Sequence, residues 1–211
     1  MRRLSRPLGI VAAGALVLFA ATACATATPG SGGSAAPLGA VTPVPPDGEV
    51  AAVGTVLDAG GDVQLCIGAI AESYPPQCGP AGIPLDGWTW EGVEGFEASG
   101  DTTWGAYAVR GTYDGDTFTA AQQPVMLALY DPIALPDPTG GEPGKGDDAT
   151  LAGIQDELPD RLGDSYLGST PQDGWLWIDV VWDDGTWQHA ADAEYGEGLV
   201  VIRSALRDMD G

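Results

Sequence analysis

Apolar residues alternate with polar or small residues in short runs between residues 49 and 131, and turn residues separate the runs. Such spacing is typical of a small β-barrel or sandwich. The Asp114-Gly115 dipeptide predicts a tight hairpin between two of the runs. The predicted strands are residues 50–57, 63–68, 88–90, 103–113, 117–120 and 124–129. This strand count fits an OB-like β-barrel over residues 49–131 best.

From residue 147 onward the pattern alternates between helix and strand. Leu151, Ile154 and Leu158 lie at spacings of three and four, which predicts a helix that Asp147 or Asp148 caps. Two predicted strands follow, then a second helix and a last strand. Their ranges are 162–168, 175–182, 186–195 and 199–202. The order α-β-β-α-β predicts a compact α+β unit over residues 147–211, and the Pro-, Gly- and Asp-rich residues 132–146 predict a linker before it.

The N-terminus carries the three parts of an export signal. Three arginines precede an apolar run at residues 8–20, and small residues then lead to Cys24. The run is shorter than the roughly 20 residues that a membrane-spanning helix needs. The pattern resembles the lipobox of bacterial lipoproteins. The resemblance implies that residues 1–23 are a signal peptide, that Cys24 is lipidated, and that the protein lies on the outer face of the cytoplasmic membrane. The alternative is a secretory peptide cut after Ala23 or Ala27.

Residues 24–48 consist mainly of Ala, Thr, Pro, Gly and Ser. A segment with so few large apolar groups does not bury enough surface to offset the entropy cost of ordering. We therefore predict a flexible tether between the lipid anchor and the folded part.

The chain is strongly acidic, with 8 Lys and Arg against 30 Asp and Glu and a net charge of −22. Cleavage of the signal peptide removes three arginines and no acid, which leaves 5 basic against 30 acidic residues and a charge of −25. Such a surface repels nucleic acid, so we expect no nucleic-acid partner. The charge is also consistent with a solvated surface that binds nothing.

Cys66 and Cys78 remain as a pair once Cys24 is lipidated. In an oxidising compartment, two remaining cysteines favour a disulfide bond. A metal site is the alternative, but no histidine lies near either cysteine in the sequence. We predict the disulfide and no metal or other cofactor.

One stretch resembles a known group of proteins. It comprises Leu65-Cys66-Ile67-Gly68, Ser73-Tyr74-Pro75-Pro76-Gln77-Cys78-Gly79, Gly87-Trp88-Thr89-Trp90 and Gly111-Thr112-Tyr113-Asp114-Gly115. These motifs are similar to those of uncharacterised actinobacterial exported and lipid-anchored proteins. The resemblance implies a secreted, disulfide-linked β domain and carries no activity.

Catalytic signatures are weak. The chain's single histidine, His189, lies on a predicted helix, and no Gly-x-Ser-x-Gly motif is present. Glu91, Glu94 and Glu97 lie near two tryptophans, so two-carboxylate hydrolysis of a carbohydrate remains an alternative. Calcium binding at the Asp114, Asp147-Asp148 or Asp183-Asp184 clusters is another, although each cluster also fits a turn or a helix cap.

The tryptophans are the strongest candidates for binding. Trp88 and Trp90, like Trp175 and Trp177, are two residues apart and so share a face of a strand. We expect one pair to lie in a core and the other, where exposed, to mark a binding face. The sequence thus predicts a non-enzymatic binding module at the cell envelope, with a protein or an envelope glycan as partner. A hydrolase of envelope carbohydrate is the alternative, and the oligomeric state stays open.

Overall fold

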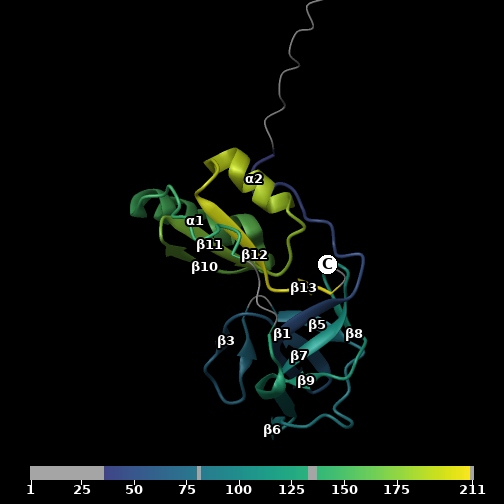
Figure 1. Ribbon diagram of the computed structural model, residues 1–211. Coiled ribbons are helices and arrows are strands. Elements are labelled where there is room, and N and C mark those ends of the chain that lie inside the picture. The colour runs from purple at the N-terminus through teal and green to yellow at the C-terminus, as the bar shows by residue number, and fades with distance from the viewer. Residues whose placement is uncertain (1–35, 80–81, 133–136, 210–211) are drawn as a thin grey trace, which may run out of the picture. The chain divides into compact units, whose positions relative to one another are not determined.

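Five strands close into a β-barrel in the first half of the folded chain (Figure 1). The computed structural model describes residues 36–79, 82–132 and 137–209. The predicted signal peptide, Cys24 and the first part of the tether lie outside these residues. In order around the barrel, the strands are β1 (Val50–Ala59), β2 (Asp62–Cys66), β5 (Gly82–Asp86), β8 (Phe118–Ala120) and β7 (Thr102–Tyr113).

The barrel closes where β1 pairs with β7 along its whole length, from Val50↔Gly111 to Ala59↔Thr102. Neighbouring barrel strands are antiparallel, except that β5 and β8 are parallel. Counted along the chain, the order around the barrel is first, second, third, fifth, fourth, which is the OB-like Greek key. The predicted small barrel is confirmed.

Shorter elements decorate the barrel. Two short strands pair with the ends of β1 and β7, a third pairs with the middle of β7, and a separate hairpin precedes β5. They are β13 (Arg207–Asp208), β6 (Glu97–Ser99), β9 (Val125–Met126), the 3-10 turn η1 (Leu127–Leu129) and the hairpin strands β3 (Ile70–Ala71) and β4 (Gln77–Cys78).

The barrel interior is filled by alternate residues of each strand, as its period of two requires. The fully buried members include Val56, Leu65, Val109 and Phe118. Gly111 lets β7 approach β8 closely, because a Cβ at this position would lie 1.9 Å from the Thr119 carbonyl oxygen.

The prediction of a strand at residues 88–90 is wrong, and the third barrel strand is β5 instead. Sequence reasoning passes over β5 because Pro84 lacks the N–H that a central strand needs. In the structure, β5 pairs with β8 only from Leu85 onward, so Pro84 has a strand neighbour on one side alone. Gly87, with φ of +71°, then ends β5 and turns the chain before Trp88.

The predicted disulfide is present between Cys66 at the end of β2 and Cys78 in β4. It fastens the β3–β4 hairpin to the barrel. Cys66, Cys78, Leu57 and Trp104 form a small apolar cluster under this hairpin.

The second half of the chain has the predicted order α-β-β-α-β. Strand β10 runs antiparallel and β12 parallel to the central strand β11, and the side chains of Leu176, Ile178 and Val180 pack in one cluster with residues of both helices. The elements are α1 (Asp148–Leu162), the 3-10 turn η2 (Gly163–Ser165), β10 (Tyr166–Gln172), β11 (Trp175–Val180), α2 (Thr186–Tyr195) and β12 (Val200–Ser204). The first strand starts at Tyr166, later than predicted, because α1 continues through Pro159 to Leu162.

Two predicted segments, the tether and the linker, end earlier in the structure than the sequence predicts. Residues 36–48, predicted as part of the tether, lie against the α+β unit, and the Leu38 side chain is 2% exposed. Residues 144–146, predicted as linker, donate backbone hydrogen bonds to the carbonyls of Asp173, Gly198 and Gly174. Composition alone misses these contacts because the partners lie far away in the sequence.

Removal of the disulfide should lower stability by an amount set by the closed loop. Cys66 and Cys78 are 12 residues apart, and a loop of this length corresponds to about 3 kcal/mol. We expect the Cys66→Ser, Cys78→Ser double variant to lose about this much free energy of unfolding in a urea titration. Reduced wild-type protein is the control and should match the variant; an unchanged urea midpoint in both would contradict the role of the disulfide.

Candidate functional site

Trp88 and Trp90 lie in the loop after β5 and pack against the barrel core. Their rings meet edge to face with centroids 5.2 Å apart, and both contact the ring of Tyr107. Both pack against the barrel core, and Trp90 Nε1 donates to Asp58 Oδ2 at 3.0 Å. This pair therefore serves the barrel, not an open strand face.

A hollow of about 200 Å³ lies beside Trp88. Among the three acidic residues of this region, Glu91 lines the hollow, whereas Glu94 and Glu97 do not. The Trp88 Nε1 atom is buried without a hydrogen-bond partner among the described residues. The hollow thus has one carboxylate at its wall, which is fewer than two-carboxylate hydrolysis requires.

Trp175 and Trp177 lie on β11, on the face of the three-stranded sheet that points away from the helices. Strand alternation sends Leu176 and Ile178 into the helix-side core and the two tryptophans to the other face. Neither tryptophan belongs to any of the apolar clusters that the described residues form. The structure thus separates the two pairs, with Trp88 and Trp90 against a core and Trp175 and Trp177 apart from one.

An arginine–aspartate pair lies next to Trp177. The Arg203 guanidinium carbon is 5.1 Å from the Trp177 ring centroid, and Arg203 donates to both oxygens of Asp179 at 2.8 and 2.9 Å. The side chains of Arg203 and Asp179 are 41% and 42% exposed. A pair this exposed adds little stability, but the two-point contact fixes the guanidinium over the indole.

Polar side chains of β10 extend this surface. Thr170 is the cross-strand partner of Trp177, and Gln172 is the partner of Trp175, so both lie on the same face as the tryptophans. Both are exposed. We call the set of Thr170, Gln172, Trp175, Trp177, Asp179 and Arg203 the β11 platform. It offers two aromatic surfaces beside hydroxyl, amide, carboxylate and guanidinium groups.

A hollow of about 500 Å³ borders the platform at Trp175 and follows the outer edge of β12. The Gln188 amide of α2 covers this edge, because it accepts from Ile202 N–H at 2.8 Å and donates to the Val200 carbonyl at 3.1 Å. The side chain thereby takes the place of a neighbouring strand and blocks pairing at that point.

The aspartates considered as calcium ligands accept hydrogen bonds from backbone N–H groups. Asp147 accepts from Thr150 N–H and caps α1, and Asp183 accepts from the N–H groups of Trp187 and Gln188 at the start of α2. Hydrogen bonds from backbone N–H groups and Thr150 lower the pKa of Asp147, whereas burial raises that of Asp183. No three metal-ligating side chains gather anywhere in the described part of the chain. His189 is exposed on α2, with Nδ1 3.0 Å from the Gly185 carbonyl oxygen.

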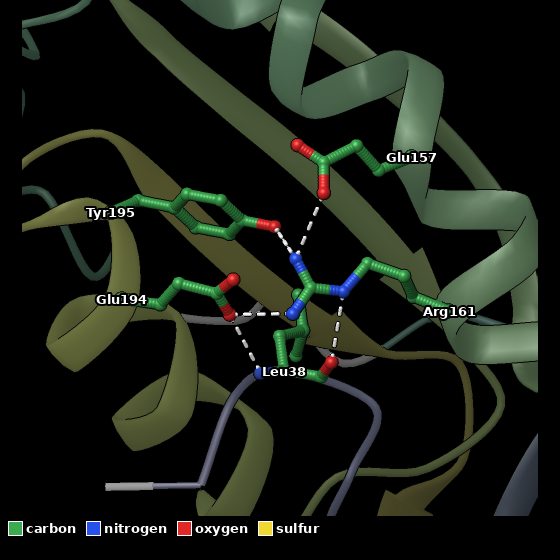
Figure 2. Close-up of polar contacts among 5 residues, drawn as sticks. All are labelled: Leu38, Glu157, Arg161, Glu194 and Tyr195. Atoms are coloured by element: carbon green, nitrogen blue, oxygen red, sulfur yellow. Dashed lines mark hydrogen bonds and ion pairs between the residues drawn. The ribbon is translucent and has the colours of Figure 1, made fainter. Parts of the chain in front are cut away.

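Residues 36–48, which we call the strap, are held by an arginine that the sequence reasoning missed. Figure 2 shows Arg161 between both helices and the strap. Its Nε donates to the Leu38 carbonyl at 3.0 Å, and its Nη2 lies 2.6 Å from Glu194 Oε2, which also accepts from Leu38 N–H. Its Nη1 contacts Glu157 and the Tyr195 hydroxyl. We call these residues the Arg161 clamp.

Gly39 makes the close approach to the clamp feasible. A Cβ there would lie 2.3 Å from the Arg161 carbonyl oxygen, and the φ of +81° also favours glycine. Further along the strap, Trp187 Nε1 donates to the Val41 carbonyl at 2.7 Å, and Trp182 Nε1 donates to the Val44 carbonyl at 2.8 Å.

Within the described ranges, no helix is long and apolar enough to cross a membrane.

Comparisons of the chain with protein-family models, with curated protein sequences and with solved structures find no match. The geometry of the described residues therefore carries the functional inference.

Loss of Arg161 should release the start of the strap. Arg161→Met removes the hydrogen bond to the Leu38 carbonyl and leaves Glu194 without its cation, at a cost of about 2 kcal/mol. We expect hydrogen exchange at Leu38 and Ala40 to accelerate more than tenfold while exchange in β1 changes little. Arg110→Met, at an exposed arginine of β7, is the matched control. Equal exchange at Leu38 in both variants would contradict the clamp.

Stability should fall steeply above pH 10. Burial, with the charges of Asp116 and Asp114, raises the pKa of Tyr113 to about 12, and burial raises the pKa of Tyr195 to about 12. A raised folded-state pKa gives stability that is complete below the unfolded value near 10 and is lost as pH rises through 12. Urea titrations of Tyr113→Phe should therefore show a flatter loss from pH 10 to 12 than wild type. Tyr74→Phe, at a tyrosine that is 72% exposed, is the control. Parallel curves for wild type and Tyr113→Phe would contradict this prediction.

Proposed function

We propose that this protein is a cell-envelope lipoprotein whose folded part is a non-enzymatic binding module, and that the β11 platform is its binding surface. The lipid anchor in this proposal is Cys24, at the end of the export signal. The binding surface rests on the geometry of the α+β unit.

The single observation that carries the proposal is the position of Trp175 and Trp177. Tryptophan is a costly residue to leave outside a core, because its large apolar surface is stabilised by burial. These two rings are half-buried, lie apart from the apolar clusters of the described residues, and share a face with the Arg203–Asp179 pair. An aromatic pair beside oriented polar groups is typical of surfaces that bind other molecules.

The chemistry of the platform suits a sugar ring or a protein side chain. A sugar stacks its C–H face on an indole while its hydroxyls meet carboxylate, amide and guanidinium groups. A protein partner would bury the same rings as anchors and pair its own polar groups with Arg203 and Asp179. The ligand class proposed is thus an envelope protein or an envelope glycan.

Hydrolysis of a carbohydrate is the weaker proposal. A glycosidase needs two carboxyl groups on either side of the scissile bond. The hollow beside Trp88 has Glu91 alone among the three nearby glutamates, and Asp179 of the platform is already paired with Arg203. No observation on the described residues favours catalysis over binding.

Crosslinking from the platform tests this proposal. A photoreactive amino acid at the exposed position Gln172 should trap a specific adduct in intact cells, and the full chain should retain an envelope glycan fraction if the ligand is a sugar. We expect Trp177→Ala or Trp175→Ala to reduce the captured ligand at least tenfold, since hot-spot aromatics contribute about 2 kcal/mol or more.

The matched control is Tyr74→Ala, which removes an aromatic side chain that is 72% exposed and lies on the barrel hairpin. Its capture should equal that of wild type. Capture that survives both tryptophan changes, or the absence of any retained protein and glycan, would refute the platform as the binding surface.

A further inference from the structure

A second cavity, of about 270 Å³, lies between the strap, the β7–β8 hairpin and the start of α2. It is separate from the β11 platform, with which it shares no residue. Two strap prolines, Pro43 and Pro45, form one wall, and Tyr113, Trp182 and Trp187 form the others. We call it the strap cavity.

The strap leaves the aromatic surfaces of this cavity apolar. The indole N–H groups of Trp187 and Trp182 are both engaged by strap carbonyls, those of Val41 and Val44. These carbonyls are three residues apart, which is the repeat of the extended conformation that proline-rich segments adopt. The polar edges of the two indoles therefore face the strap, and carbon surfaces remain for the cavity.

Negative charge lies at the hairpin side of the cavity. Asp114 and Asp116 line it and are both exposed. Hydrogen bonds from the backbone N–H groups of Thr117 and Asp116 lower the pKa of Asp114, so its carboxylate stays ionised at neutral pH. Both charges act on the Tyr113 hydroxyl in the cavity wall and contribute to its raised pKa.

No basic side chain lines the strap cavity in the described part of the chain. The surrounding protein carries a net charge of −22, so a cation is attracted and an anion is repelled. Aromatic faces and carboxylates together select organic cations, because the ring quadrupole and the carboxylate charge attract the same group. A cavity smaller than the roughly 300 Å³ of drug-sized sites fits one side chain or one small headgroup.

We propose that the strap cavity binds an alkylammonium group, either the ammonium of a lysine side chain or a small quaternary ammonium. Tyr113, Trp182 and Trp187 contact its carbon atoms, and Asp114 and Asp116 balance its charge. The strap supplies the proline wall, so the site exists only while the strap is docked.

Titration of the full-length protein with simple cations tests this proposal. The probes are choline, Nα-acetyl-lysine methylamide and 3,3-dimethyl-1-butanol (dimethylbutanol below). In the last of these, a carbon replaces the choline nitrogen. The signals are the indole N–H resonances of Trp182 and Trp187, followed by NMR at constant ionic strength. We expect saturable shifts with one or both cations and none with dimethylbutanol; the tighter of the two cations identifies the source of the ammonium group.

Two variants make the test specific. Asp116→Asn keeps the shape of an exposed side chain and should weaken cation binding about fivefold. Asp101→Asn removes the same charge at an exposed turn away from the cavity and should leave the affinity unchanged. Shifts that never saturate, equal binding of dimethylbutanol, or equal affinities of the two variants would each overturn the proposal.

Discussion

The pairing of β1 with β7 is the constraint on which the rest of the structure depends. The ladder runs from Val50↔Gly111 to Ala59↔Thr102 and closes the barrel, so the facing edges of both strands are paired along this length. The N-terminal end of β1 also pairs with β13, which follows the last strand of the α+β unit. Leu206 and Val181 enter the barrel core from that unit. One strand thus closes the barrel and joins it to the second half of the chain.

The two sheets place their tryptophans in different ways. In the barrel, Trp88 and Trp90 follow β5 and pack, partly buried, against the core. In the three-stranded sheet, α1 and α2 already cover one face with the side chains of Leu176 and Ile178. The other face then presents Trp175 and Trp177, both half-buried, and the Arg203 guanidinium lies over the Trp177 ring. A parallel pair such as β11 and β12 commonly has both faces covered, and here the second face is the platform.

Local sequence patterns predict much of this fold. The spacing of Leu151, Ile154 and Leu158 predicts α1, and the alternation from Trp175 to Val180 predicts both β11 and which residues face the helices. The two cysteines predict their own disulfide. The sequence analysis did not predict strand β5, because Pro84 interrupts the alternation in which Ile83 and Leu85 are buried.

Long-range contacts account for the features that the sequence did not predict. The strap is predicted as a tether because its larger apolar residues, Leu38, Val41 and Val44, are few and lie among small residues and prolines. Arg161, which binds the Leu38 carbonyl, is 123 residues away in the sequence. Arg203 and Asp179 meet only because β11 and β12 pair in parallel after the helix α2. Pattern and composition describe neighbours along the chain, so neither contact has a local signal.

The central claim is that the β11 platform serves a ligand, and it depends most on Trp177, because Trp175 also donates from Nε1 to the Glu142 carbonyl at 2.9 Å. The most direct test compares the free energies of unfolding of Trp177→Ala and Trp88→Ala by urea titration. The account predicts a loss of about 1 kcal/mol or less for Trp177→Ala, and about 3 kcal/mol for Trp88→Ala, because the half-buried Trp88 ring packs against the barrel core. Equal and large losses for the two variants would show that Trp177 belongs to the structural core, and would contradict its assignment to a binding surface.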